Sequence, residues 1–203
     1  MFQHSTSQPV VIVGIDEAGR GALAGPVVAG ACLLIDALEG QSLIRDSKQL
    51  SPAQREEAFV WIEANCTFGF GVVEGHEVDT IGILGATEKA MNMALSMIED
   101  SIKPTYILVD GRDKFWFNYP HTGIVRGDES EPCISAASIV AKVLRDRLMV
   151  RHADAFPRYK FEEHKGYGAP EHIDAIRTLG PCPLHRKTFL RNIIGGVAGA
   201  RRA

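Results

Sequence analysis

One stretch of apolar residues that ends in two adjacent acids constrains this chain more than any other. Residues 10–15 read Val-Val-Ile-Val-Gly-Ile, which is the composition of a buried strand, and Asp16 and Glu17 follow directly. Neighbouring carboxylates repel each other, and partial burial adds a desolvation cost. Gly19 and Gly21 indicate that the chain leaves strand geometry here, which would let both acids turn toward one bound cation.

Two other interpretations of this stretch deserve comparison. An isolated Asp-Glu-Ala-Gly is equally compatible with a solvated acidic turn at the end of a strand. Gly19, Gly21 and Gly25 also resemble a dinucleotide-binding turn, but that turn requires a helix to begin at the glycines. Residues 26–35 instead have the apolar composition of a second strand, so the dinucleotide-binding interpretation fails.

The pattern of an apolar strand followed by an acid occurs twice more. Residues 105–109 predict a strand that ends at Asp110, and residues 121–127 predict a weaker one that ends at Asp128. In sheets that carry helices, ligand sites collect at strand ends, so distant acids can converge there. With the two acids of the first strand, they predict a metal site, and hard oxygen ligands favour Mg²⁺ or Mn²⁺ over zinc.

Helices are predicted between and after these strands. Residues 51–65 begin with a Ser cap and a Pro, and residues 78–99 place alanines and methionines at helical spacing, as core filling. A strand is predicted between them at 67–74. Residues 132–155 predict a helix whose small side chains let it lie close against the sheet.

The periphery of this last helix is expected to be basic. The side chains concerned are Lys142, Arg145, Arg147 and Arg151. Asp146 could be a further acid near the metal cluster, but we favour an ion pair with those arginines. Glu129 adds a negative charge beside Asp128, and its role stays open.

Acidic and basic residues are segregated along the chain. Residues 1–141 hold 9 Lys and Arg against 19 Asp and Glu, whereas residues 142–203 hold 13 against 6. Such asymmetry suggests an anionic polymer or a membrane surface as partner. The alternative is that the basic part only neutralises the acidic part within the fold.

Composition limits the remaining classes. With 203 residues and 45% hydrophobic content the chain fits one globular domain with an appendage. No apolar run reaches the length of a membrane span, and residues 1–8 lack the layout of a signal peptide, so we expect a cytoplasmic protein. The four cysteines lack CxxC spacing and are expected to be reduced thiols without a disulfide partner. Cys182 and His185 are too few ligands for a structural zinc site.

The C-terminal part is rich in loops and carries exposed charge. We predict a disordered N-terminus at 1–9, a catalytic core at 10–155, a helical and loop segment at 156–194, and a flexible tail at 195–203. Tyr167 lies between two glycines near Lys165 and Arg186, a combination that suits stacking on sugars or bases together with phosphate contacts. Alternatively, Tyr167 anchors an irregular segment by packing.

Six blocks of the sequence, in order from residue 10 to residue 190, resemble bacterial ribonuclease HII, the type 2 ribonuclease H. The blocks lie at 14–21, 46–50, 109–111, 127–143, 164–168 and 184–189. The resemblance implies the α/β ribonuclease H-like fold, a five-stranded mixed sheet flanked by helices, with a C-terminal helical segment. It also implies hydrolysis of the RNA strand of RNA/DNA hybrids and nicking 5′ of single ribonucleotides in duplex DNA, giving 3′-hydroxyl and 5′-phosphate ends.

The same resemblance assigns roles to individual residues. It implies that catalysis and metal binding fall on four acids: Asp16, Glu17, Asp110 and Asp128. It implies substrate contacts by Gly19, Arg20, Gly21 and, at the junction, Tyr167. We expect Ser47 and Lys48 to grip a flanking phosphate, and two metal ions about 4 Å apart to assist hydrolysis by a monomer. The competing hypotheses are a non-catalytic nucleic-acid binding module and a metal-dependent DNA-junction nuclease.

Overall fold

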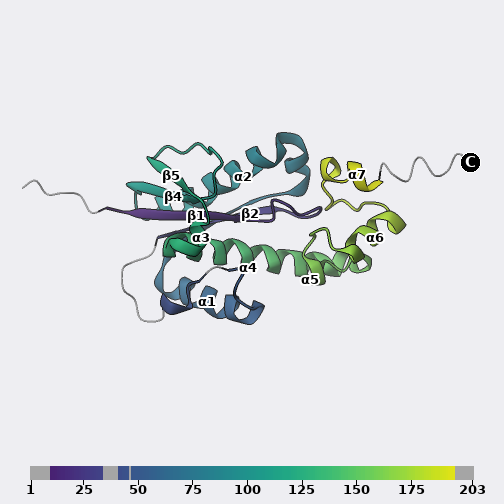
Figure 1. Ribbon diagram of the computed structural model, residues 1–203, viewed down its shortest axis with the longest axis horizontal. Coiled ribbons are helices and arrows are strands. Elements are labelled where there is room, and N and C mark those ends of the chain that lie inside the picture. Colours follow the sequence, from purple (N-terminus) through teal and green to yellow (C-terminus); the bar gives the residue numbers. More distant parts are fainter. Residues whose placement is uncertain (1–9, 34–40, 46, 195–203) are drawn as a thin grey trace, which may run out of the picture.

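Five strands form one mixed sheet with the order β3-β2-β1-β4-β5 (Figure 1). The computed structural model describes residues 10–33, 41–45 and 47–194. The strands are β1 Ile12–Ala18, β2 Val27–Leu33, β3 Thr67–Val73, β4 Tyr106–Asp110 and β5 His121–Ile124. β1 pairs antiparallel with β2 and parallel with β4, so strand direction changes at the centre. The predicted five-stranded mixed sheet is confirmed.

Helices cover both faces of this sheet, with α2 on one face and α4 and α1 on the other (Figure 1). The helices are α1 Pro52–Asn65, α2 Gly75–Glu99, α3 Gly127–Ser130, α4 Pro132–Ala155, α5 Phe161–His164, α6 Pro170–Leu179 and α7 Arg191–Ile194. Short 3-10 helices are η1 Gln41–Leu43, η2 Pro157–Tyr159 and η3 Lys187–Phe189. One hydrophobic core lies between α2 and the sheet, and a second lies between α4 and α1. No described helix is both long enough and apolar enough to cross a bilayer.

α4 lies very close to the central strands, as its small residues predicted. A Cβ on Gly14 would lie 2.3 Å from the carbonyl carbon of Cys133, and one on Gly30 would lie 2.3 Å from the carbonyl oxygen of Ala137. Only strand positions without side chains permit this approach. The close packing fixes the side chains of α4 relative to β1.

α2 differs from the continuous helix predicted at 78–99. It starts at Gly75 and is interrupted at Gly82, whose φ of 75° and ψ of 162° are not helical. Glycine adopts such angles without a Cβ clash. Met93 and Met97, the methionines predicted to fill the core, are 41% and 43% exposed, so that prediction was wrong. Met91, which the predicted spacing did not include, is fully buried instead.

The C-terminal segment packs against the end of α4. Tyr159 and Phe161 join Met149 and Ala153 of α4 in a third hydrophobic cluster, which also contains Ala24. The chain between β1 and β2 therefore lies between the sheet and this segment. The predictions made for residues 1–9 and 195–203 fall outside the described residues.

Candidate metal centre and nucleic-acid interface

Three aspartates from separate parts of the chain converge at one edge of the sheet. Asp16, Asp110 and Asp128 each offer a carboxylate oxygen within 4.8 Å of the others. Asp16 and Asp128 are 5% and 2% exposed, and Asp110 is half-buried. The sequence prediction that these acids meet therefore agrees with the structure.

β1 and β4 position two of these aspartates. The parallel pairing of β1 with β4 ends at Ile15↔Val109, one residue before Asp16 and Asp110. β1 nevertheless continues to Ala18, paired with β2. Asp16 is therefore inside a strand rather than at its tip, and the acid cluster lies where β1 and β4 separate.

Asp128 reaches the cluster by a turn that differs from the prediction. β5 ends at Ile124, and Asp128 lies in the first turn of α3 instead of at a strand end. Arg126 adopts a left-handed conformation with φ of 57°, which reverses the chain. Two backbone amides then donate to Oδ1 of Asp110, from Gly127 at 2.8 Å and from Asp128 at 3.4 Å. These bonds hold the two aspartates together.

Glu17 lies beside the three aspartates and lines the same cavity, of about 440 Å³, as Asp16 and Asp110. It was expected to turn into the cluster where the glycines break the strand, but strand geometry continues through Ala18. Its Oε1 accepts a bond of 3.1 Å from Arg20 Nη1. Its Oε2 is buried and has no hydrogen-bond partner in the described part of the chain.

Burial and mutual repulsion perturb these carboxylates. Burial, followed by the charges of Glu17 and Asp110, raises the pKa of Asp16 well above its ordinary value. Burial also raises the pKa of Glu17, against the opposing effect of Arg20, and burial together with the charge of Asp128 raises that of Asp110. A cation among them would relieve this repulsion. With the unpartnered Oε2 of Glu17, the cluster fits a divalent metal ion held by oxygen ligands.

The glycine loop, residues 19–26, begins at the cavity, where Gly19 and Arg20 are among the lining residues. Gly19 has φ of 96°, and Gly21 is exposed with nothing within 4 Å of a hypothetical Cβ. Between them Arg20 pairs with Glu17 at 3.1 Å and with Asp113 at 2.8 Å. The loop therefore presents open backbone beside the acids while Arg20 holds its position.

Tyr167 lies near the glycine loop at the same cavity. Its side chain is half-buried and lines the cavity together with Gly19. Arg145 Cζ lies 4.9 Å and Lys142 Nζ 5.6 Å from the centre of its ring. The carbonyl of Gly166 accepts from the amide of Leu23 at 2.8 Å. The segment that carries the ring is thus tied to the glycine loop.

Two arginines expected at the surface are fully buried. Arg145 and Arg186 are both 0% exposed. Arg186 donates to the carbonyls of Gly25, at 3.0 and 2.8 Å, and of Arg20, at 3.0 Å. Burial lowers the pKa of Arg186 to about 10. The structure therefore corrects the predicted direct substrate contact of Arg186, because its guanidinium supports the glycine loop from inside the protein.

Ser47 and Lys48 lie at the cavity in different ways. Ser47 is 3% exposed, and its Oγ lies 2.7 Å from Oγ of Ser138, so its hydroxyl is engaged within the protein. Lys48 Nζ pairs with Oδ2 of Asp128 at 2.6 Å. Arg55 donates to the carbonyl of Ser47 at 2.9 Å and fixes this segment. Asp46, the first residue of the block at 46–50, lies outside the described residues.

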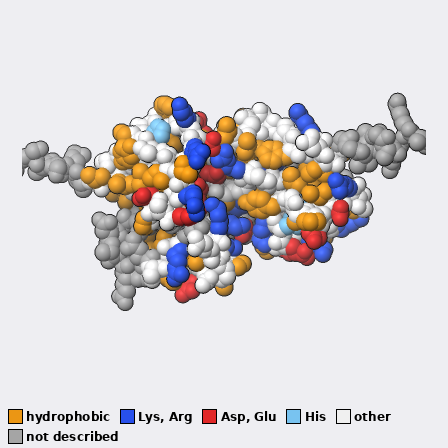
Figure 2. Space-filling view, viewed as in Figure 1, with side chains coloured by type: hydrophobic (Ala, Val, Ile, Leu, Met, Phe, Trp, Pro, Cys, Tyr) orange, Lys and Arg blue, Asp and Glu red, His pale blue; other side chains and the backbone are white. Residues whose placement is uncertain are grey.

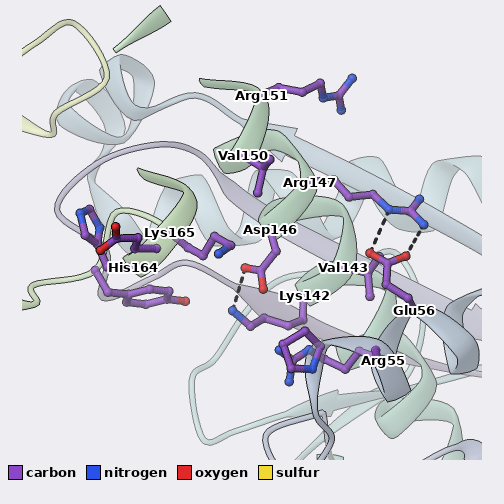
Figure 3. Close-up of a pocket in the computed structure, with 14 residues that line it drawn as sticks. Arg55, Glu56, Lys142, Val143, Asp146, Arg147, Val150, Arg151, His164 and Lys165 are labelled. Carbon is purple, nitrogen blue, oxygen red and sulfur yellow. Dashed lines mark hydrogen bonds and ion pairs between the residues drawn. The ribbon is translucent and has the colours of Figure 1, made fainter. Parts of the chain in front are cut away.

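A larger groove, of about 1030 Å³, adjoins this cavity and runs between α1, α4 and α5 (Figure 3). Three residues line both spaces: Arg55, Lys142 and Tyr167. Lys165 also lines the groove, and its ammonium donates to the carbonyl of Glu162. Asp146 pairs with Lys142 at 2.7 Å, so the favoured ion pair exists but its partner is the lysine.

Basic side chains surround the acids and the groove. Figure 2 shows Lys and Arg gathered around a small group of acidic side chains in the middle of this face and continuing over α4. In the groove Arg147 pairs with Glu56 at 2.5 Å (Figure 3). The surface beside the acid cluster is therefore suited to a polyanion.

Three histidines support the segment that carries Tyr167, a role that the sequence predicted for none of them. Nδ1 of His172 lies 2.8 Å from the carbonyl oxygen of Tyr167, and its Nε2 lies 3.1 Å from Nε2 of His185. His164 stacks on His172 at 4.2 Å. His164 and His185 lie in the sequence blocks 164–168 and 184–189 that resemble ribonuclease HII, and their place in those blocks was the one sign in the sequence that they matter.

Comparison with known proteins places this geometry in a family. A family model described as Ribonuclease HII matches residues 13–192. The Ribonuclease HII of Geotalea daltonii is 50% identical over 179 residues, 88% of this chain and 82% of the relative. The crystal structure of the ribonuclease H2 from Pyrococcus horikoshii OT3 matches with a TM-score of 0.71 at 26% identity, over 93% of this chain and 99% of that one. Bst-RNase HIII, crystallised in complex with Mn²⁺, shares the fold with a TM-score of 0.72 at 18% identity, over 96% and 71% of the two chains.

Proposed function

The chain belongs to the ribonuclease HII family, and we propose that it hydrolyses the RNA strand of RNA/DNA hybrids and nicks duplex DNA 5′ of single embedded ribonucleotides. One observation carries the proposal. Three aspartates lie within 4.8 Å of one another beside a cavity that is also lined by the glycine loop and Tyr167. A metal-dependent phosphodiesterase needs the acids to hold its metal, and selection of a ribose needs groups such as the glycine loop and Tyr167 to contact the sugar.

Four carboxylates are proposed to hold the metal. Asp16, Asp110 and Asp128 offer converging oxygens, and Glu17 offers a buried oxygen without a partner. Two divalent ions, Mg²⁺ or Mn²⁺, would supply an activated water and stabilise the leaving 3′-oxygen, which gives 3′-hydroxyl and 5′-phosphate ends. The protein contributes an arrangement of oxygens held by strand pairing and by the amides of α3.

Recognition of the ribonucleotide is proposed for the glycine loop and Tyr167. The 2′-hydroxyl marks a ribose within DNA, and the exposed backbone at Gly21 permits close approach to it. Arg20, held by Glu17 and Asp113, keeps this backbone in place. The ring of Tyr167 would stack on the neighbouring deoxyribose.

The groove and its basic side chains would hold the flanking duplex. Lys142 and Lys165 line the groove. Lys48, which now pairs with Asp128, would contact a flanking phosphate once Asp128 binds a metal ion instead. In this proposal residues 10–155 form the catalytic core, and residues 156–194 supply the tyrosine and part of the groove. We further propose that the protein acts as a cytoplasmic monomer.

One assay tests the proposal. The protein is incubated with duplex DNA that carries a single ribonucleotide, with Mg²⁺, Mn²⁺ or EDTA, beside an all-DNA duplex of the same sequence. We expect a nick 5′ of the ribonucleotide only when metal is present. Binding without nicking would instead support a nucleic-acid binding module, and nicking of the all-DNA duplex would support a junction nuclease.

A further inference from the structure

Arg145 lies at the junction of the two segments that would read the ribonucleotide, and the proposed function gives it no role. It projects from α4 into the protein interior and is 0% exposed. Its Nε donates to the carbonyl of Pro26 at 3.0 Å, and its Nη2 donates to that of Ala24 at 3.2 Å. These bonds attach the glycine loop to α4.

The same guanidinium contacts Gly19 and Tyr167. A Cβ on Gly19 would lie 2.0 Å from Nε and 2.6 Å from Cδ of Arg145, so the glycine backbone rests directly on this side chain. Cζ lies 4.9 Å from the centre of the Tyr167 ring, within cation–π distance. One planar group therefore contacts both the loop and the ring.

Arg145 forms no direct ion pair with an acid of the described residues, and the nearby Asp146 pairs with Lys142 instead. Its Nη1 is buried without a hydrogen-bond partner in the described part of the chain. Burial lowers the pKa of this guanidinium, against the smaller opposing effects of Tyr167 and Asp146. A buried cation without a paired anion is costly, so the ring face of Tyr167 is part of its compensation.

We propose that Arg145 is a positioning residue that sets the spacing between the glycine loop and the ring of Tyr167, and thereby the selection of single ribonucleotides. The inference rests on the proposed function. A lone ribonucleotide must place its 2′-hydroxyl at the loop and its neighbouring deoxyribose at the ring simultaneously, so small displacements matter. A run of ribonucleotides offers a ribose at every position and tolerates such displacement better.

The test compares kcat/KM on two substrates, a duplex with one ribonucleotide and an RNA/DNA hybrid. Arg145→Lys keeps the charge but loses the planar group that reaches both carbonyls and the ring. We expect it to lower the ratio of single-ribonucleotide to hybrid activity about tenfold. In Tyr167→Ala, the added Arg145→Lys should lower the ratio no further, because the two residues act through one contact. Arg177→Lys, at an exposed ion pair with Asp174 on α6, is the arginine control and should leave the ratio unchanged.

Each other outcome overturns the inference. Equal losses on both substrates with a lower melting temperature would make Arg145 purely structural, and additive losses in the double variant would separate it from Tyr167. If Arg145→Lys does not fold, Arg145→Gln, which keeps an amide donor, takes its place, and failure of both to fold again assigns a structural role. A wild-type protein that nicks neither substrate refutes the proposed function, whereas an active wild type with an unchanged ratio in Arg145→Lys refutes only this inference.

Discussion

Gly19→Ala should lower stability and Gly21→Ala should impair recognition of the ribonucleotide, although the two glycines are separated by only one residue. Gly19 has φ of 96° and lies against Arg145, whereas a Cβ at Gly21 would meet nothing within 4 Å. The first glycine is therefore required by the fold. The fold does not require a glycine at the second position, and in the proposed function the backbone of Gly21 faces the ribose.

The magnitude for Gly19→Ala follows from two contributions. A left-handed backbone costs a non-glycine residue roughly 1–2 kcal/mol, and overpacking costs typically 1–3 kcal/mol. The clash cannot be relieved cheaply, because Arg145 is held by the carbonyl of Pro26, which itself lies 2.8 Å from the added Cβ. We expect a loss of about 2–5 kcal/mol, which lowers the melting temperature by about 10 °C in a chain of this size.

Thermal and urea unfolding of both variants, followed by nicking of a single-ribonucleotide duplex, provide the test. Gly21→Ala should unfold within about 0.5 kcal/mol of the wild type yet lose nicking. A Gly19→Ala protein as stable as the wild type would refute the packing argument. Full nicking by Gly21→Ala would refute the proposed approach of the ribose to this backbone.

Three further predictions concern charge. Asp16→Asn should abolish metal-dependent nicking without lowering stability in metal-free buffer. Burial and the neighbouring acids already disfavour the charged form of Asp16, so loss of that charge costs the fold little. Normal cleavage by this variant would disprove the proposed metal site. Burial lowers the pKa of His172 to about 4 and also lowers that of His185. The stability that the neutral histidines contribute above about pH 6.5 should therefore be lost as the pH falls toward 4. Urea titrations of the wild type and of His172→Asn measure this loss, and an equal pH dependence in both proteins would show that His172 is not its cause. Binding of a hybrid, measured in EDTA by fluorescence anisotropy, should weaken steeply between 50 and 200 mM salt, and salt-independent binding would refute the basic groove.

Sequence patterns predicted the sheet and the convergence of the acids well, because both depend on local signals. Alternating and continuous apolar runs fix the strands, and two of the acids, Asp16 and Asp110, lie directly after the apolar residues of β1 and β4. The turn that carries Asp128 was not predictable, since it depends on a left-handed conformation at Arg126, which favours no such turn by residue type. The interruption at Gly82 was equally hidden within a continuous helical pattern.

The burial of Arg145 and Arg186 could not be predicted for a different reason. Their partners are backbone carbonyls 119 to 166 residues away in sequence, and a carbonyl leaves no trace in residue type. Arginine side chains are mostly exposed, so the residue type alone predicts a place at the surface for both. The two guanidiniums instead donate hydrogen bonds to carbonyls of the glycine loop, and these bonds help a glycine-rich segment to keep one conformation.

This arrangement also favours one of the two explanations of the charge asymmetry. If the basic part only neutralised the acidic part, its side chains would pair with the acid cluster. Arg147 of the basic part does pair with Glu56 of the acidic part, but Glu56 lies outside that cluster. Among the described residues, Asp128 pairs with Lys48 and Glu17 with Arg20, both from the acidic part, while Lys142 pairs with Asp146 inside the basic part. The two buried arginines bind carbonyls rather than carboxylates. The acid cluster is thus not neutralised by the basic part. In the proposed function the cluster binds a metal ion and the basic part binds a polyanion, as hydrolysis of a nucleic acid requires.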